Sequence, residues 1–194
     1  MFRQIFRARR LPPSSPFRRQ FSTKAIYSSF PATLHYYSPQ RSSSLYERKE
    51  SGSPPEDIFD EGVTLKHGLV YPAVDKSVSN GAVMFPNTFL MQEIVRMYFD
   101  ETLDREDEGK NVETPFIYTI PRGTPVPSHL ILINEYLCRF SLQPSRGIPL
   151  EYLNRSLDEF YLKHGSKETA ESWLDRHPFQ EAVPDEADDV WMAK

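Results

Sequence analysis

Three strand-like runs follow one another in the second half of this 194-residue chain, and they constrain the fold more than any other feature. The runs occupy residues 116–120, 130–133 and 138–142 and are rich in β-branched and aromatic residues. Turn-forming residues separate them, namely Gly123, Pro125, Pro127 and Asn134. This half of the chain is therefore predicted to be β-rich.

Two amphipathic helices are predicted on either side of these runs. The first begins after Pro86, where Asn87 or Thr88 can cap the free backbone amides. The acidic run 100–108 that follows it is interpreted as a solvated linker closed by Gly109. The second helix follows the loop 144–149 and ends at Gly165, a C-cap. Apolar residues recur at helical spacing in both: Phe89, Leu90, Ile94, Val95 and Tyr98 in the first, and Leu150, Leu153, Leu157, Phe160 and Tyr161 in the second.

The remaining elements are short, because 17 prolines interrupt the chain. Strands are predicted at 32–37 and 68–71, a surface helix at 42–51, a turn at Asn80-Gly81 and a short helix at 168–173. Strands and helices are segregated rather than alternating, which is typical of an α+β fold.

The N-terminal segment differs in charge from the rest of the chain. Residues 1–46 hold eight basic residues and no acidic one, which leaves 15 basic against 27 acidic residues beyond them. An arginine-rich, serine-containing and acid-free N-terminus is typical of a mitochondrial presequence. We expect a presequence at 1–21, cleaved after Phe21, and a flexible lead-in segment at 22–30. The alternative is a basic tail that binds nucleic acid or anionic lipid.

Composition excludes several classes of protein. The acidic body lacks the clustered basic face that nucleic-acid binding needs, and no apolar run is long enough to span a bilayer. Five histidines lie without metal-binding spacing, and the single cysteine, Cys138, predicts an inert buried thiol and allows no internal disulfide. Gly-rich phosphate loops, Gly-x-Ser-x-Gly and His-Glu-x-x-His are absent from the sequence. We therefore expect a soluble protein without a metal site.

A set of polar and aromatic residues at strand and loop positions remains as a candidate site. It comprises His35, Tyr37, Asn80, Gly81, Ser141 and Gln143. His35 and Tyr37 share one strand face by period two, as do Ser141 and Gln143. Residue chemistry alone does not assign an activity to this set.

A series of motifs resembles the Tse-two type VI secretion effector toxin family and its fungal relatives. The similarity extends from about residue 31 to residue 163, which is most of the chain after the presequence. Its motifs are His67-Gly68-Leu69-Val70-Tyr71-Pro72, Asn80-Gly81, Pro86-Asn87-Thr88, Tyr118-Thr119-Ile120-Pro121-Arg122-Gly123-Thr124 with Pro125 and Pro127, Leu132 and Phe140-Ser141-Leu142-Gln143-Pro144, and the helix from Pro149 to Phe160.

The resemblance implies an ADP-ribosyltransferase-like domain at 31–165, with a split antiparallel β core and flanking helices, followed by a short helix and acidic tail at 166–194. It implies that NAD is bound and that ADP-ribose goes to an unidentified acceptor. His35, Tyr37 and Asn80 would bind NAD, and Ser141 and Gln143 would be catalytic. Relatives tend to have an arginine where Tyr37 stands, and a hydroxyl residue where Ala82 and Val83 stand.

Three of these assignments have alternatives. His35 could be satisfied locally, Asn80 could adopt a positive φ beside Gly81, and Gln143 could cap a turn. Tyr36 would pack in the core and Arg139 would be a surface cation. The alternative for the whole chain is a mitochondrial interaction protein of the same fold that has lost its catalytic site.

Overall fold

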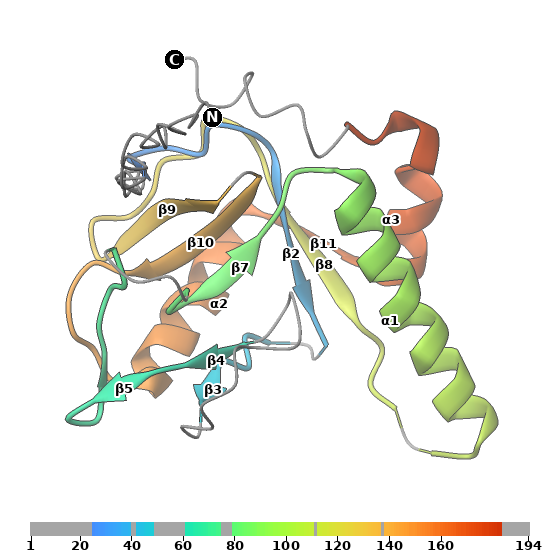
Figure 1. Ribbon diagram of the computed structural model, residues 1–194, viewed down its shortest axis with the longest axis horizontal. Coiled ribbons are helices and arrows are strands. Elements are labelled where there is room, and N and C mark those ends of the chain that lie inside the picture. Colours follow the sequence, from blue (N-terminus) through green and yellow to red (C-terminus); the bar gives the residue numbers. More distant parts are fainter. Residues whose placement is uncertain are drawn as a thin grey trace, which may run out of the picture.

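The computed structural model describes residues 25–39, 42–48, 61–74, 79–110, 112–136 and 138–183 (Figure 1). The predicted presequence and residues 184–194 of the tail lie outside them. The strands are β1 (Ile26–Tyr27), β2 (Leu34–Ser38), β3 (Tyr46–Glu47), β4 (Gly62–Val63), β5 (Leu65–Lys66), β6 (Leu69–Val70), β7 (Ala82–Met84), β8 (Phe116–Ile120), β9 (Leu130–Tyr136), β10 (Arg139–Pro144) and β11 (Ser166–Thr169). The helices are α1 (Phe89–Asp107), α2 (Leu150–His164) and α3 (Ala170–Arg176), and a 3-10 turn follows at Phe179–Glu181.

Two antiparallel sheets form the centre of the fold. One has the strand order β1-β9-β10-β7 and the other has the order β11-β8-β2. They are joined between β2 and β7, where His35 N donates to Phe85 O at 2.7 Å and Phe85 N donates to His35 O at 3.0 Å. The predicted α+β class and split antiparallel β core are therefore confirmed.

Each face of the β core is covered by different helices. Leu153, Leu157 and Phe160 of α2 pack into the larger hydrophobic cluster. Met91 of α1 and Trp173 of α3 pack into the second cluster on the other face. Figure 1 shows α1 and α3 side by side, with α2 apart from them behind β7 and β10.

Helix α1 is longer than predicted. Thr88 caps it, since its Oγ1 accepts a hydrogen bond from Met91 N at 3.1 Å, as expected for one of the two candidates. The acidic run interpreted as a linker is helical as far as Asp107, so that interpretation was wrong. An exposed polar segment continues a helix that is already nucleated, because propagation needs no apolar face. Gly109, with φ of 73°, follows the helix end.

Two short segments also differ from the prediction, because partners distant in sequence determine them. The expected helix at 42–51 is wrong in its described part: Asn154 on α2 accepts from Leu45 N at 3.2 Å and donates to Leu45 O at 2.9 Å. Residues Tyr46–Glu47 then pair with β4. Strand β11, which was not predicted, pairs with β8, and the short helix begins at Ala170 after it.

The boundaries of the domain extend beyond the predicted ones at both ends. Residues 26–30 were expected to be a flexible lead-in segment, yet β1 pairs with β9 and Phe30 is 1% exposed. At the other end, Trp173 is fully buried, so β11 and α3 belong to the domain rather than to a tail. Gly165 is the C-cap of α2 as predicted.

The expected turn with positive φ at Asn80-Gly81 is wrong. Within the described residues, His67 is the one non-glycine residue with positive φ, and Gly81 is not among the glycines that have it. Position 81 requires glycine for a steric reason instead, because a side chain there would clash with β10. A Cβ atom there would lie 2.3 Å from Leu142 O and 2.9 Å from Cγ of Gln143, because the backbone before β7 runs close to β10.

We predict that Gly81→Ala lowers the free energy of unfolding by more than about 2 kcal/mol, because the β10 backbone has to shift. The matched control is Gly109→Ala. The surroundings of Gly109 are open, so only the positive φ costs stability there, by about 1 kcal/mol. Urea denaturation of both variants measures the difference, and equal losses would contradict this account of Gly81.

Candidate functional site

The five predicted site residues lie on or beside three neighbouring strands, β2, β7 and β10. All are buried: His35 is 2% exposed, Tyr37 6%, Asn80 4%, and Ser141 and Gln143 0%. Their side chains nevertheless enter four different environments. Only Ser141 and Gln143 contact each other directly, through a hydrogen bond of 2.7 Å from Gln143 Nε2 to Ser141 Oγ.

Ser141 and Gln143 hold a carboxylate that the sequence analysis missed. Oε1 of Glu135 accepts a hydrogen bond from Ser141 Oγ at 2.5 Å and from Gln143 Nε2 at 2.7 Å. Gln143 is itself fixed, since its Oε1 accepts from Ala73 N at 2.8 Å. We call Glu135, Ser141 and Gln143 the Glu135 cluster.

The position of Glu135 follows from an irregularity of the hairpin. The register between β9 and β10 shifts between Arg139 and Phe140, so that Asn134 and Tyr136 have partners on β10 and Glu135 has none. This bulge gives the carboxylate access to side chains of the neighbouring strand. A sequence signal for it existed, namely an acidic residue two positions after the strand-like apolar run 130–133.

The Glu135 cluster can present a fixed negative charge. Ser141 and Gln143 are fully buried, whereas Glu135 is only partly buried, so Glu135 is the member of the cluster with solvent-accessible surface. Two donors on one oxygen fix the orientation of the group. Such a carboxylate can accept a hydrogen bond from a ligand hydroxyl and stabilise positive charge that develops nearby.

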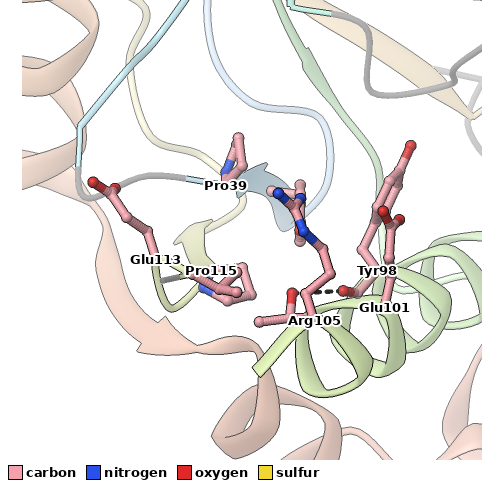
Figure 2. Close-up of a pocket in the computed structure, with 9 residues that line it drawn as sticks. Pro39, Tyr98, Glu101, Arg105, Glu113 and Pro115 are labelled. Atoms are coloured by element: carbon pink, nitrogen blue, oxygen red, sulfur yellow. Dashed lines mark hydrogen bonds between the residues drawn. The ribbon is translucent and has the colours of Figure 1, made fainter. Parts of the chain in front are cut away.

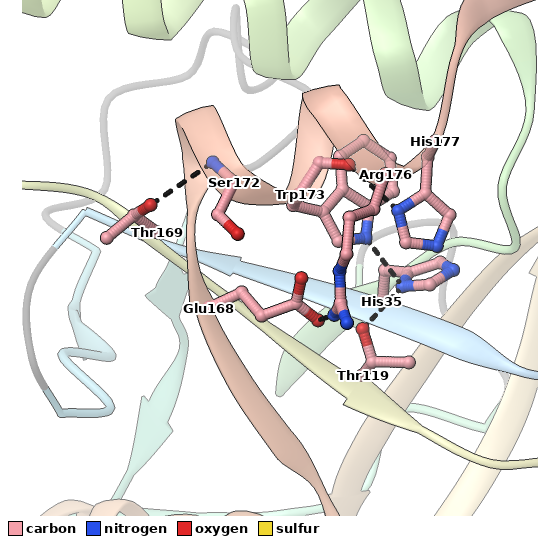
Figure 3. Close-up of polar contacts among 8 residues, drawn as sticks. All are labelled: His35, Thr119, Glu168, Thr169, Ser172, Trp173, Arg176 and His177. Carbon is pink, nitrogen blue, oxygen red and sulfur yellow. Dashed lines mark hydrogen bonds and ion pairs between the residues drawn. The ribbon is translucent and has the colours of Figure 1, made fainter.

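His35 belongs to an aromatic group that links β2 to α3 (Figure 3). Its Nδ1 accepts a hydrogen bond from Trp173 Nε1 at 3.1 Å and lies 2.9 Å from Thr119 Oγ1. The ring meets Trp173 edge-on, with centroids 5.1 Å apart, and Trp173 stacks on His177 at 4.6 Å. The alternative, in which groups of the protein itself satisfy the hydrogen bonding of His35, is therefore correct for its Nδ1 atom.

The imidazole of His35 is neutral. Burial, and secondarily the neighbouring His177, lowers its pKa from 6.5 to about 3. Because an indole N–H can only donate, Nδ1 is the acceptor and the ring proton resides on Nε2. Figure 3 shows Nε2 pointing away from Thr119 and Trp173.

His35 also lines a cavity of about 440 Å³, which we call the His35 cavity. Its walls come from β2, from the turn before α1, from the end of β8 and from residues after α3. The polar residues that line it are Thr33, His35, Asn87, Thr119, Arg122, His177 and Glu181. It shares no residue with the Glu135 cluster.

Tyr37 lines a different cavity, of about 410 Å³, between the end of β2 and α1 (Figure 2). Its ring stacks on Tyr98 with centroids 5.3 Å apart. Arg105 extends from α1 across this cavity toward Pro39, and Glu101 and Glu113 also line it. A cation therefore lies close to Tyr37, although it comes from another element.

The Asn80 side chain hydrogen-bonds to the backbone of two neighbouring segments, at Thr64 and at Tyr71. Its Oδ1 accepts from Thr64 N at 2.6 Å, and its Nδ2 donates to Thr64 O at 3.1 Å and to Tyr71 O at 2.7 Å. All its described hydrogen bonds are to backbone. In this structure Asn80 positions the chain around β5 and β6 rather than facing either cavity.

The sequence also gave expectations for the burial of Tyr36 and Arg139. Tyr36 is 1% exposed in the core, where it stacks on Tyr161 with centroids 5.0 Å apart, as expected. Its hydroxyl donates to Glu61. Burial, followed by the Glu61 charge, raises the pKa of Tyr36 well above its usual value. Arg139, expected to be a surface cation, is partly buried.

The described ranges hold no group of three or more His, Cys, Asp or Glu residues able to bind a metal ion. None of the helices in these ranges is both long enough and apolar enough to cross a bilayer.

The family model for the Tse2 ADP-ribosyltransferase toxin matches residues 32–173, which spans β2 to α3 and holds every residue of the Glu135 cluster. Comparisons with curated proteins and with solved structures give no match.

The lowered pKa of His35 predicts a pH-dependent stability. The folded state keeps the ring neutral to about pH 3, whereas the unfolded chain binds a proton below about pH 6.5. The stabilisation is therefore complete above pH 6.5 and is lost as pH falls toward 3, by about 2 kcal/mol between roughly pH 7.5 and 5.

Urea denaturation at both pH values tests this prediction. The variant His35→Gln should lose about 2 kcal/mol less than the unsubstituted protein on acidification, because it no longer takes up this proton. The variant His129→Gln, at an exposed position, is the control and should behave like the unsubstituted protein. The same acid-induced loss in all three proteins would contradict a neutral, buried His35.

Proposed function

This chain belongs to the Tse2 ADP-ribosyltransferase toxin family, and we propose that it binds NAD and transfers ADP-ribose from NAD to an acceptor. In this reaction the bond between nicotinamide and ribose breaks, nicotinamide leaves, and the ribose carbon bonds to a nucleophile of the acceptor. Positive charge develops on the ribose as the bond breaks. A site for this chemistry therefore needs a fixed negative group beside the ribose.

The Glu135 cluster is the observation that carries this proposal. Glu135 supplies a carboxylate that two fully buried donors hold in one orientation. A group that is oriented in advance needs no rearrangement when charge develops, which is why it stabilises a transition state more than water does. We assign the contact with the ribose to Glu135, and we assign Ser141 and Gln143 as positioning residues that act through it.

Strand β2 supplies no positive charge to the proposed contacts with NAD. His35 is neutral, and Tyr37 stands where relatives tend to have arginine. If His35 contacts NAD, it does so by donating from Nε2, and Tyr37 can offer its ring face to nicotinamide. Arg105 in the Tyr37 cavity is the cation best positioned to replace the missing arginine.

We predict that Glu135→Gln lowers the rate of NAD-dependent ADP-ribose transfer by about 100-fold or more, because the amide carries no charge. The amide oxygen can still accept from Ser141 and Gln143, so the fold should be retained. The measurement is release of nicotinamide from NAD by the full chain, together with mass addition to proteins of a mitochondrial extract.

The matched control for this prediction is Glu159→Gln, at an exposed position of α2. It should leave the rate unchanged. Equal rates in Glu135→Gln and in the unsubstituted protein would remove Glu135 from the mechanism. No nicotinamide release by the unsubstituted protein would favour the alternative of an interaction protein without activity.

We also propose that the protein acts in mitochondria, as the composition of residues 1–21 indicates. The first described strand begins at Ile26, so cleavage after Phe21 would remove none of the described elements. Import would bring the domain to the mitochondrial NAD pool and separate it from cytosolic acceptors.

We predict that a fusion of residues 1–29 to a fluorescent protein co-localises with a mitochondrial marker. The same fusion with Arg3→Gln, Arg7→Gln and Arg10→Gln should remain in the cytosol, because the cationic face of the segment is lost. A cytosolic location of the unsubstituted fusion would contradict mitochondrial import and would leave the family assignment unchanged.

A further inference from the structure

We propose that Asn80 is a positioning residue for the Glu135 cluster and that it acts on the cluster through Gln143. The expected effect on the reaction rate rests on the proposed function, because that function gives Glu135 its contact with the ribose. The structural basis is a series of contacts that leads from the Asn80 amide, through residues 71–73, to the Gln143 amide.

The amide of Asn80 has one orientation that satisfies its neighbours. Thr64 N can only donate, so Oδ1 of Asn80 faces it at 2.6 Å. The backbone oxygens of Thr64 and Tyr71 can only accept, and Nδ2 donates to them at 3.1 Å and 2.7 Å. Both amide hydrogens are thereby used, and the Tyr71 carbonyl is held in a fixed position.

Pro72 carries this restraint from Tyr71 to Ala73. The Tyr71 carbonyl belongs to the peptide plane that ends at Pro72, and the Ala73 N–H belongs to the next plane. Only φ and ψ of Pro72 lie between these planes, and the proline ring fixes φ. One free torsion angle therefore separates the carbonyl that Asn80 holds from the N–H that donates to Gln143.

Residues that follow β10 hold the same segment from its other side. Val70 N donates to Ile148 O at 2.8 Å, and Ile148 N donates to Val70 O at 3.1 Å. The Tyr71 ring lies against Gly147, where a Cβ atom would be 2.5 Å from Cε1 of the ring. The segment is thus held between the chain that enters β7 and the chain that leaves β10.

The Ala73 N–H determines the orientation of the Gln143 amide. Because this N–H can only donate, Oε1 of Gln143 faces it at 2.8 Å, and Nε2 faces Glu135 at 2.7 Å. If the Ala73 N–H moved away, the buried Oε1 would lose this donor, and the amide could turn away from Glu135. Glu135 would then keep only one of the two donors that orient its carboxylate.

Gly81, the residue after Asn80, also acts on Gln143. A Cβ atom at position 81 would lie 2.9 Å from Cγ of Gln143, so glycine leaves room for the stem of this side chain. Asn80 controls the amide end of Gln143, and Gly81 accommodates its stem. The Asn80-Gly81 pair therefore serves the Glu135 cluster, although neither residue belongs to it.

The variant Asn80→Asp tests the proposal. Its carboxylate can still accept from Thr64 N, but it opposes the backbone oxygens of Thr64 and Tyr71 and so releases residues 71–73. We expect kcat for nicotinamide release by the full chain to fall at least about tenfold, because a misplaced Glu135 stabilises the transition state less. KM for NAD should change by less than about twofold, since the lost interaction is made in the transition state.

The matched control is Asn154→Asp. Asn154 holds Leu45 in a similar way, since its Oδ1 accepts from Leu45 N at 3.2 Å and its Nδ2 donates to Leu45 O at 2.9 Å. It lies on α2, and Leu45 packs in the larger hydrophobic cluster with that helix. This variant should lose a comparable part of its stability in urea and should keep its kcat.

A double-mutant cycle separates positioning from a general structural defect. In the Gln143→Ala background, Asn80→Asp should lower kcat by less than about twofold, because Asn80 acts through the residue already removed. A structural defect would lower kcat equally in both backgrounds. If Asn80→Asp does not fold, Asn80→Ser takes its place, since it keeps a side-chain oxygen but loses the amide donors.

NMR of the Gln143 side-chain amide reads the same effect without enzymatic activity. Its Nε2 hydrogens donate to Glu135 and Ser141, so their resonances should shift in Asn80→Asp and remain unchanged in Asn154→Asp. Unshifted resonances in Asn80→Asp, or an equal fall of kcat in the two backgrounds, would overturn the proposal. If the unsubstituted chain releases no nicotinamide, the proposed function fails, and the NMR result alone decides whether Asn80 positions Gln143.

Discussion

Two hydrogen bonds between His35 and Phe85 join the two sheets, and the rest of the structure depends on this junction. β2 and β7 pair there by one isolated bridge, whereas β2 forms a full ladder with β8, and β7 with β10. The imidazole of the same residue accepts from Trp173, which brings α3 onto the sheet face that α1 also covers. A charged ring would be costly at this buried position, which is why His35 stays neutral.

The proposed chemistry depends on a partly buried carboxylate that two fully buried side chains hold in place. Glu135 reaches Ser141 and Gln143 because the β9–β10 register shifts, and Gln143 fits because Gly81 leaves space beside it. A buried network of this kind fixes geometry only when its members are satisfied, and here backbone from residue 73 completes it. The carboxylate of Glu135 thus owes its orientation to three separate parts of the chain.

The local sequence pattern was sufficient to predict those helices and strands that are determined by their own residues. The apolar spacing of α2 and the β-branched runs of β8, β9 and β10 gave these elements and the α+β class. It was not sufficient where distant partners decide: Asn154 holds Leu45 extended, and β8 recruits Ser166–Thr169 as a strand. The same reason explains why only part of the site was predicted. Ser141 and Gln143 were found by their shared strand face, but Glu135 joins them through a bulge that no periodicity reveals.

The central claim is that Glu135, held by Ser141 and Gln143, contacts the ribose from which nicotinamide departs. A crystal structure of the full chain with a non-hydrolysable NAD analogue tests it most directly. We expect a hydrogen bond between the Glu135 carboxylate and a hydroxyl of the nicotinamide ribose, with Ser141 and Gln143 still donating to Glu135. An analogue bound with its ribose distant from Glu135 would contradict it.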